Sequence, residues 1–212
     1  MIATQGLVYR YPGGSLLQFA NMTVPQGTAL LLRGDSGAGK STWLALVAGL
    51  LTPTQGEVTV AGQALNALAP AARDAWRARA LGFLPQKLHL SDALTVADNL
   101  ALVYFAAGLP RDAAAIHAAL AALGVAALAD RRPSQLSGEQ AQRVALARAV
   151  LLNPRVILAD EPTASLDDGA AAAALQLLRE AAGRCGATLV IATHDRRVEQ
   201  VFESALVHTL QP

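Results

Sequence analysis

A glycine-rich stretch constrains this chain more than any other segment: Gly34-Asp35-Ser36-Gly37-Ala38-Gly39-Lys40-Ser41-Thr42. An apolar, strand-like run precedes it at residues 28–33, and residues 43–50 follow with a helical pattern. A strand, a glycine-rich loop and a helix in this order suit a polyphosphate, because glycines let backbone N–H groups turn inward and the helix N-terminus adds positive partial charge. The pattern G-x-x-x-x-G-K-[ST] is matched from Gly34 to Ser41.

Two side chains in this loop have the chemistry that a nucleotide polyphosphate requires. Lys40 supplies a positive charge that can reach the β- and γ-phosphates of ATP, and the Ser41 hydroxyl can hold the Mg²⁺ that bridges them. The alternative is a glycine-rich turn that binds nothing. Lysine is rare in this chain, with only Lys87 besides Lys40, so the lysine at this position argues against that alternative. We therefore predict ATP and Mg²⁺ as ligands.

The composition excludes several classes of protein. A net charge of +1 provides no basic field for nucleic acid, so we expect no nucleic-acid partner. The sequence has no run of about eighteen strongly apolar residues that would span a bilayer, and residues 1–5 lack the features of a signal peptide. We therefore expect a cytoplasmic protein. The single cysteine, Cys185, excludes a disulfide framework and a cysteine metal site.

A short continuous apolar run at residues 156–159 and a second buried-strand pattern at residues 187–193 indicate the fold class. Such runs are typical of strands that are buried on both faces of a parallel sheet. They deliver Asp160-Glu161 and His194 to the carboxyl ends of their strands, which is where open α/β sheets bind ligands. The sequence therefore predicts an α/β protein with a parallel-sheet core.

Two smaller regions are predicted around that core. Short strand-like segments over about residues 1–32 and 52–62 favour an antiparallel β-subdomain. Helical periodicity dominates residues 87–152, which favours a helical subdomain. The remainder forms the core, and the length of the chain favours a single domain over residues 1–212.

Capping residues predict where the helices begin and end. Residues 98 to about 129 have a helical pattern that a Gly-Leu-Pro sequence interrupts. Ser137, with Gln140 three residues later, forms a capping box that opens the next helix. A further helix is expected over residues 169–182, ending before Gly183.

With these motifs in place, the chain resembles the nucleotide-binding subunit of ABC transporters, a P-loop NTPase with a RecA-like core, over nearly its whole length. Residues 34–42 resemble the Walker A loop, and Asp160-Glu161 resembles Walker B with its following glutamate. The other matches are the Q-loop glutamine Gln86, the signature motif Leu136-Ser137-Gly138-Glu139-Gln140, the D-loop Ser165-Leu166-Asp167 and the switch histidine His194. Their joint occurrence in this order is specific, because P-loop kinases and GTPases lack the signature helix.

The resemblance implies a role for each residue around one ATP. Asp160 would orient Mg²⁺ through water, with Ser41 and Gln86 as further ligands. Glu161 would polarise the attacking water, and His194 would hold the γ-phosphate and that water in line. The phosphates would lie against Gly34, Asp35, Ser36, Gly37, Ala38, Gly39, Lys40, Ser41 and Thr42.

The resemblance implies further site residues at the adenine base of ATP and across a dimer interface. Tyr11 either stacks on the adenine or packs in a hydrophobic cluster. Residues 136–140 and Asp167 would meet ATP bound to a second subunit, so two subunits, identical or paired, would clasp two ATP molecules. Glu139 departs from the family motif LSGGQ, in which glycine stands at this position, and it brings a negative charge near a phosphate-facing loop.

The resemblance also implies membrane partners. Integral membrane transporter subunits would dock near residues 86–95, where Leu88, Leu90 and Leu94 are apolar, and would hold the protein on the inner face of the cell membrane. Among subfamilies, the chain most resembles lipoprotein-releasing and macrolide-export ATPases. The short stretch after His194 is expected to leave no room for the regulatory C-terminal domain of some importer ATPases.

Two other functions stay open at this point. One is a soluble ABC ATPase that serves no transporter, although such relatives usually carry a long coiled-coil insertion or two tandem cassettes. The other is a P-loop kinase, which would need an acceptor pocket and a lid in place of the signature helix. The sequence specifies neither the transported molecule nor the direction of transport.

Overall fold

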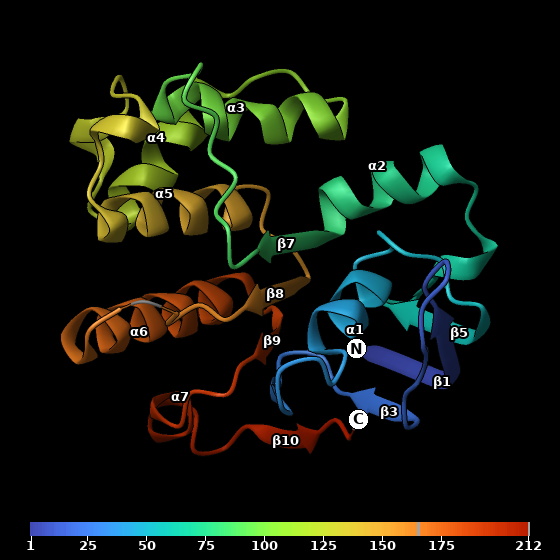
Figure 1. Ribbon diagram of the computed structural model, residues 1–212. Coiled ribbons are helices and arrows are strands. Elements are labelled where there is room, and N and C mark those ends of the chain that lie inside the picture. Colours follow the sequence, from blue (N-terminus) through green and yellow to red (C-terminus); the bar gives the residue numbers. More distant parts are fainter. Residues whose placement is uncertain (165, 212) are drawn as a thin grey trace.

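The computed structural model describes residues 1–164 and 166–211, and a five-stranded parallel sheet lies at its centre (Figure 1). The sheet has the order β10-β4-β9-β8-β7, and all four pairings are parallel. Its strands are β4 (Ala29–Arg33), β7 (Leu81–Leu84), β8 (Val156–Asp160), β9 (Thr188–Ala192) and β10 (Leu206–Thr209). The parallel-sheet core predicted from the apolar runs is confirmed.

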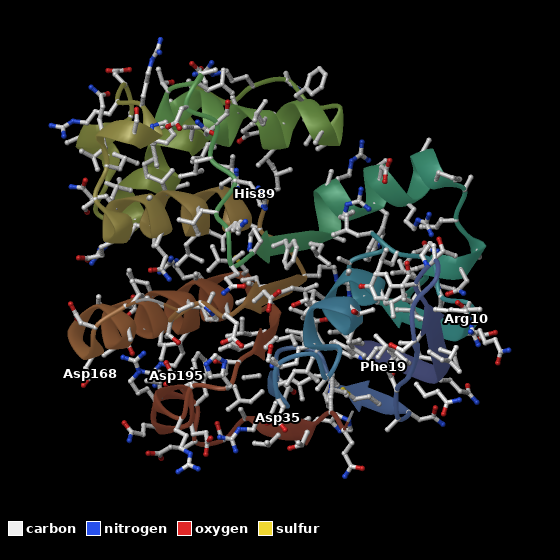
Figure 2. The ribbon with its side chains drawn as sticks, in the orientation of Figure 1. Arg10, Phe19, Asp35, His89, Asp168 and Asp195 are labelled. Atoms are coloured by element: carbon white, nitrogen blue, oxygen red, sulfur yellow. The ribbon has the colours of Figure 1, made fainter. Side chains whose placement is uncertain are left out.

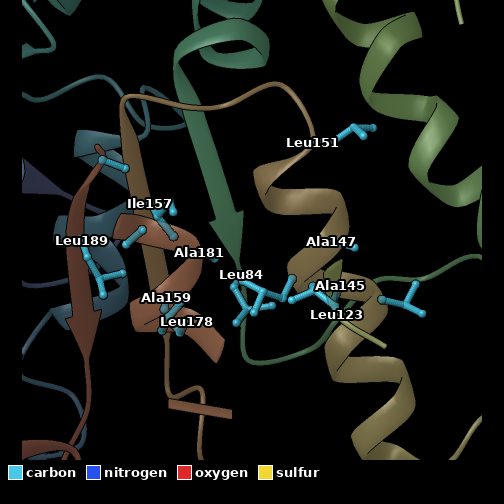
Figure 3. Close-up of a cluster of buried hydrophobic side chains, with 14 of the residues drawn as sticks. Leu84, Leu123, Ala145, Ala147, Leu151, Ile157, Ala159, Leu178, Ala181 and Leu189 are labelled. Atoms are coloured by element: carbon cyan, nitrogen blue, oxygen red, sulfur yellow. The ribbon is translucent and has the colours of Figure 1, made fainter. Parts of the chain in front are cut away.

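Alternate residues of the central strands pack into two hydrophobic clusters, one on each face of the sheet. Ile157 and Ile191 belong to one cluster, whereas Leu158 and Val190 belong to the other. This division follows from the period of two along a strand, and it explains why consecutive residues in the centres of these strands are apolar. Figure 3 shows the first cluster, in which Leu84, Ile157 and Leu189 of the sheet meet side chains of two long helices.

Helices cover both faces of this sheet (Figure 1). α1 (Lys40–Val47) contacts the sheet on the side of the second cluster, and α6 (Asp168–Cys185) packs on the side of the first. The shorter α7 (Arg197–Val201) follows β9, and α2 (Pro70–Ala80) precedes β7. The prediction that the helix after residue 168 ends before Gly183 is wrong. Gly183 lies inside α6, and Gly186 in the left-handed conformation caps that helix instead.

A second, antiparallel sheet lies beside α1 (Figure 1). Its strands are β1 (Ile2–Arg10), β2 (Leu16–Gln18), β3 (Met22–Val24), β5 (Gln55–Val60) and β6 (Gln63–Ala64). The predicted limits of this region need correction at two points. Residues 29–32 belong to β4 of the parallel sheet, and β6 extends the antiparallel pairing beyond residue 62.

The helical region lies over the other end of the sheet (Figure 1) and consists of three helices, with two short 3₁₀ turns between the second and the third. These elements are α3 (Val96–Ala107), α4 (Ala113–Ala122), η2 (Ala126–Leu128), η3 (Pro133–Gln135) and α5 (Gly138–Val150). The helical pattern was expected to continue to about residue 129, but α4 ends at Ala122. Another 3₁₀ turn, η1 (Leu65–Ala67), precedes α2. Over the described part of the chain, no helix combines the length and the apolar character that a membrane span requires.

Candidate active site

A cavity of about 580 Å³ opens where the carboxyl ends of β4 and β8 meet the start of α1. It brings together residues that are far apart in the sequence, from the N-terminal sheet to the end of β9. Its lining residues are Tyr11, Ser15, Leu17, Asp35, Ser36, Gly37, Gly39, Lys40, Ser41, Thr42, Gln86, Asp160, Glu161 and His194. Most of the residues predicted to surround one ATP therefore lie around one cavity. Gly34 and Ala38 are part of the same loop but do not line it.

The loop between β4 and α1 depends on glycine at positions where side chains would clash or strain the backbone. Gly39 has φ of 90°, in the left-handed region, and an added Cβ would lie 3.2 Å from the Phe19 ring. Gly34 has φ of 145°, and its Cβ would lie 2.9 Å from the carbonyl oxygen of Leu210. Because side-chain-bearing residues avoid this backbone geometry, the glycines fix the loop shape that precedes α1.

Lys40, the first residue of α1, lies across this loop with a side chain that is only 9% exposed. Its Nζ donates to the carbonyl oxygens of Gly34 at 2.7 Å and Asp35 at 3.2 Å, and it lies 3.9 Å from Glu161 Oε1. The ammonium group therefore lies between the loop and the carboxylate at the end of β8. A positive charge at this point suits the outer phosphates of a nucleotide.

Glu161 is held by strained backbone and by two hydrogen bonds. Its φ of 48° is in the left-handed region, which is costly for a residue other than glycine. Thr193 Oγ1 donates to Glu161 Oε2 at 3.0 Å, and His194 Nδ1 lies 2.8 Å from Oε1. The Glu161 side chain is 12% exposed. The carboxylate is thus fixed at the cavity wall by the two residues that follow β9.

Thr193 was not predicted as a site residue. It lies between the end of β9 and His194. This position could have identified it as a site residue, because groups at the carboxyl end of a parallel strand face the ligand site. Its hydroxyl also accepts a hydrogen bond from the Asp195 backbone N–H at 3.0 Å. Thr193 therefore connects the Glu161 carboxylate to the segment that begins α7.

The oxygen atoms near Asp160 fit a magnesium ion. Burial raises the pKa of the Asp160 carboxyl; the Ser41 side chain opposes this effect, and the nearby Glu161 charge adds to it. A buried carboxylate under these conditions gains from a divalent cation. Mg²⁺ usually takes one or two carboxylates together with substrate phosphates and water, so the Asp160 carboxylate, the Ser41 hydroxyl and the Gln86 amide form an adequate set. Within residues 1–164 and 166–211, no cluster of three or more His, Cys, Asp or Glu side chains forms a self-sufficient metal site.

Tyr11 packs against an aromatic neighbour and also faces the cavity. Its ring packs edge-on against Tyr9, with ring centroids 4.8 Å apart, and its hydroxyl lies 2.9 Å from Thr42 Oγ1. Tyr11 is nevertheless 42% exposed and lines the cavity. A ring held in this way leaves aromatic surface available at the entrance of the cavity, as a base platform requires.

The signature residues lie elsewhere. Ser137 Oγ accepts from the Gln140 N–H at 3.2 Å, and Gln140 Oε1 accepts from the Ser137 N–H at 3.0 Å, so the predicted capping box is confirmed. Leu136 packs partly against the core, whereas Ser137, Gly138 and Glu139 are exposed at the start of α5. Within one chain, these residues do not reach the cavity around Lys40.

Glu139 is paired with a basic residue one turn along α5. Arg143 donates to Glu139 Oε1 from Nε at 3.0 Å and from Nη2 at 2.7 Å, while its Nη1 donates to the Leu123 carbonyl oxygen at 3.2 Å. The negative charge that departs from the family motif is therefore compensated inside its own helix.

The loop after Glu161 is tied to the segment after β9. Asp167 caps α6 by accepting from the Ala170 N–H at 2.8 Å, and it does not line the cavity. The predicted D-loop serine, Ser165, lies outside the described residues. Figure 2 shows Asp168 at the start of α6 and Asp195 between that helix and α7. Asp195, together with Arg197, forms a network that sequence reasoning did not find.

Comparisons with known proteins agree with this geometry. A profile described as "ABC transporter" matches residues 17–164. The methionine import ATP-binding protein MetN of Cupriavidus metallidurans is 40% identical over 98% of this chain, which spans 62% of that relative's length. The lipoprotein-releasing system ATP-binding protein LolD of Anaeromyxobacter dehalogenans is 43% identical over 86% of this chain and 78% of its own length.

Solved structures show the same fold. The ATP-binding cassette MJ0796, in a dimeric post-hydrolysis state bound to ADP and Pi, aligns with a TM-score of 0.88 and 30% identity. The alignment covers 100% of this chain and 94% of that chain. The sequence expectation of a P-loop NTPase fold with two sheets and a helical region is confirmed.

Proposed function

The chain belongs to the ABC transporter family, and from this premise we propose that it hydrolyses ATP, pairs with a second subunit when ATP and Mg²⁺ bind, and drives transport through membrane partners. The observation that carries the proposal is the convergence of Lys40, Asp160 and the Glu161–His194 pair on one cavity. Phosphate-binding charge, a metal-binding carboxylate and a held general base are the parts that phosphoryl transfer to water needs.

The residues of this chain have separate tasks in the reaction. Lys40 binds the β- and γ-phosphates, and the glycine loop holds them at the start of α1. Glu161 accepts a hydrogen bond from the attacking water and turns its oxygen toward the γ-phosphorus while ADP leaves. Thr193 and His194 keep that carboxylate in place. Ser41, Asp160 and Gln86 would hold Mg²⁺, which supplies charge compensation for the phosphate oxygens.

We assign the signature residues to a partner subunit's ATP. Ser137, Gly138 and Glu139 are exposed at the start of a 13-residue helix, whose backbone N–H groups and dipole suit an anion. Within one chain they are separate from the cavity, so a second subunit has to bring its nucleotide to them. The dimeric state of the related cassette MJ0796 supports this arrangement. Asp167, at the start of α6, is proposed to lie near the same interface.

A groove of about 550 Å³ between α2, α3, α5 and β7 is the surface that we propose for membrane subunits. Leu50 and Leu102 line it and are 50% and 45% exposed, and Phe105 on α3 is 86% exposed. The docking region expected at residues 86–95 is less suitable, because Leu88 and Leu90 pack against the core. Docking here would hold the protein at the inner face of the cell membrane.

Glu161→Gln tests the proposed activity most simply. It keeps the shape of the side chain and removes the carboxylate, so steady-state phosphate release should fall by about 100-fold or more, as for loss of a general base. Glu180→Gln is the matched control, since Glu180 lies on the exposed surface of α6, away from the cavity, and accepts a hydrogen bond from Gln176. If Glu161→Gln released phosphate within a few-fold of the parent chain, the assignment of Glu161 would be wrong.

A further inference from the structure

Two loops at the carboxyl ends of β8 and β9 are joined by a network of polar contacts. The first, which we call loop A, consists of the described residues 162–164 and 166–168, and the second, loop B, consists of residues 193–197. Thr163 of loop A is 1% exposed, and its hydroxyl donates to Asp195 Oδ2 in loop B at 2.6 Å. A short bond from a buried hydroxyl to a carboxylate holds the two loops together.

Arg197 makes most of the remaining contacts between these loops. Its Nε lies 3.0 and 2.9 Å from the two Asp195 oxygens, and its Nη2 donates to Oδ2 at 2.7 Å. Its Nη1 donates across to loop A, to Asp168 Oδ1 at 2.8 Å and to the Leu166 carbonyl oxygen at 3.3 Å. One planar guanidinium thus spans both loops, which a lysine ammonium cannot do with the same geometry.

The electrostatics of Asp195 agree with this geometry. Hydrogen bonds from Arg197, with a smaller contribution from Thr163, hold the pKa of the Asp195 carboxyl far below its usual range. The Asp195 side chain is 15% exposed, so its bonds to Arg197 are shielded from water more than those of a surface pair. Asp195 therefore stays ionised and bonded at any pH at which the enzyme would work.

Loop B also carries the two residues that hold the catalytic carboxylate. Thr193 donates to Glu161 and accepts from the Asp195 N–H, and His194 contacts the other Glu161 oxygen. The path from Arg197 to Glu161 is therefore short: Arg197 bonds the Asp195 carboxylate, the Asp195 backbone N–H bonds the Thr193 hydroxyl, and that hydroxyl bonds Glu161. A shift of Asp195 would move the groups that aim the carboxylate.

We propose that Arg197 is a positioning residue for ATP hydrolysis. By holding Asp195 against loop A, it sets the place of Thr193 and His194 at the Glu161 carboxylate. This inference rests on the proposed function, because Glu161 must act on the attacking water. Arg197 does not line the cavity, so it has no part in binding ATP itself.

Arg197→Ala is the direct test. Phosphate release at saturating ATP should fall by roughly 10- to 100-fold, as expected when a reacting group is misplaced by about 1 Å, while KM for ATP changes by less than about twofold. Arg197→Lys should restore only a small part of the rate, because lysine cannot bridge Asp195 and the Leu166 carbonyl. Arg179→Ala is the matched control, since Arg179 also bonds a side chain and a backbone carbonyl, those of Gln176 and Val201, away from both loops.

A coupling measurement separates positioning from a general effect on folding. If Arg197 acts through loop B, the slowing in the double variant Arg197→Ala, His194→Ala should be smaller than the product of the two single slowings, because His194 carries part of the effect of Arg197, whereas independent effects would multiply. Single-turnover phosphate release gives both rates. Should Arg197→Ala not fold, Thr163→Val serves in its place, because it removes one hydroxyl from the same network at nearly constant volume and should slow turnover in the same way.

The possible outcomes separate this inference from the proposed function. Two results would overturn the positioning role, provided that Glu161→Gln is inactive. One is a normal rate for Arg197→Ala, and the other is that the slowing caused by Arg197→Ala and the slowing caused by His194→Ala multiply in the double variant. A normal rate for Glu161→Gln would instead overturn the proposed function itself. A lower melting temperature for Arg197→Ala with an unchanged kcat would show that Arg197 only stabilises the fold, and it would also count against the inference.

Discussion

The phosphate loop and the signature helix differ in how complete they are within one chain. Around Lys40, the cavity already contains a buried ammonium, a carboxylate at the end of β8 and a held glutamate. At Ser137, the capping box satisfies the helix start, and the adjoining residues face outward. In the proposed site, folding of one chain completes the phosphate-loop half, whereas the half at Ser137 requires a second subunit. Under this proposal, a single subunit would bind ATP and would hydrolyse it only after pairing with a second subunit.

The two regions also differ in backbone strain. The phosphate loop and Glu161 use left-handed backbone at Gly37, Gly39 and Glu161; glycine adopts it without steric cost, whereas at Glu161 the surrounding packing has to stabilise it. The start of α5 has an unstrained cap: Ser137 has φ of −68° and ψ of 162°, in the extended region. Of these two regions, the cavity therefore holds the strained residue, Glu161, whereas the cap of α5 is unstrained.

Substituting Gly39 should disrupt the phosphate loop and leave the start of α5 unchanged. In Gly39→Ala, the added Cβ meets the Phe19 ring and the residue must keep φ of 90°, so we expect ATP affinity to fall by roughly tenfold, in line with about 1–3 kcal/mol of strain. Titration calorimetry with ATP and Mg²⁺ measures this change. An unchanged affinity would show that the loop does not depend on its glycine conformation.

Gly183→Ala is the matched control for that variant. Gly183 lies inside α6, and among the described residues an added Cβ would meet no atom within 4 Å beyond its chain neighbours and the backbone of its own helix. Thermal unfolding should show a gain of about 0.5–1 kcal/mol, because alanine is the better helix former, with ATP affinity unchanged.

Arg143→Ala tests the charge at the start of α5, the helix that the signature residues open. It leaves the Glu139 charge uncompensated at the start of α5, so ATP-dependent pairing should weaken by roughly threefold at low salt, as for a partly exposed ion pair. Added salt should reduce the effect. Glu139→Gly in the same chain should restore pairing; a double variant as weak as Arg143→Ala would show instead that Arg143 acts through the Leu123 carbonyl oxygen.

The sequence predicted local patterns better than contacts between distant segments. The buried runs of β8 and β9 and the cap at Ser137 are local, and all three are present as expected. The pairing of β4 with β9 joins segments about 160 residues apart, as Ala29 and Leu189 illustrate, and the apolar run at residues 28–33 did not reveal which strand it would pair with. The helix ending at Gly183 was wrong because packing of an apolar face outweighs the modest cost of one glycine in a helix.

The same distinction applies to the candidate site. Lys40, Asp160 and Glu161 belong to recognisable motifs, and they line one cavity. The Thr163–Asp195 bond links residues 32 positions apart, and neither residue type is unusual after a strand. The Glu139–Arg143 pair, by contrast, has the i, i+4 spacing of a helical ion pair and was readable from the sequence alone.

The central claim is that Ser137 acts on a partner's ATP. Size exclusion with light scattering of Glu161→Gln, in ATP and Mg²⁺, tests it most directly, since this variant should bind ATP without escaping through hydrolysis. We predict a dimer for Glu161→Gln and for the control Ser134→Arg, Glu161→Gln, whose added arginine lies in the exposed η3 turn just before the signature motif. We predict a monomer for Ser137→Arg, Glu161→Gln, with its ATP affinity intact. A Ser137→Arg, Glu161→Gln protein that still dimerises with ATP would contradict the account and leave Ser137 as a helix cap only.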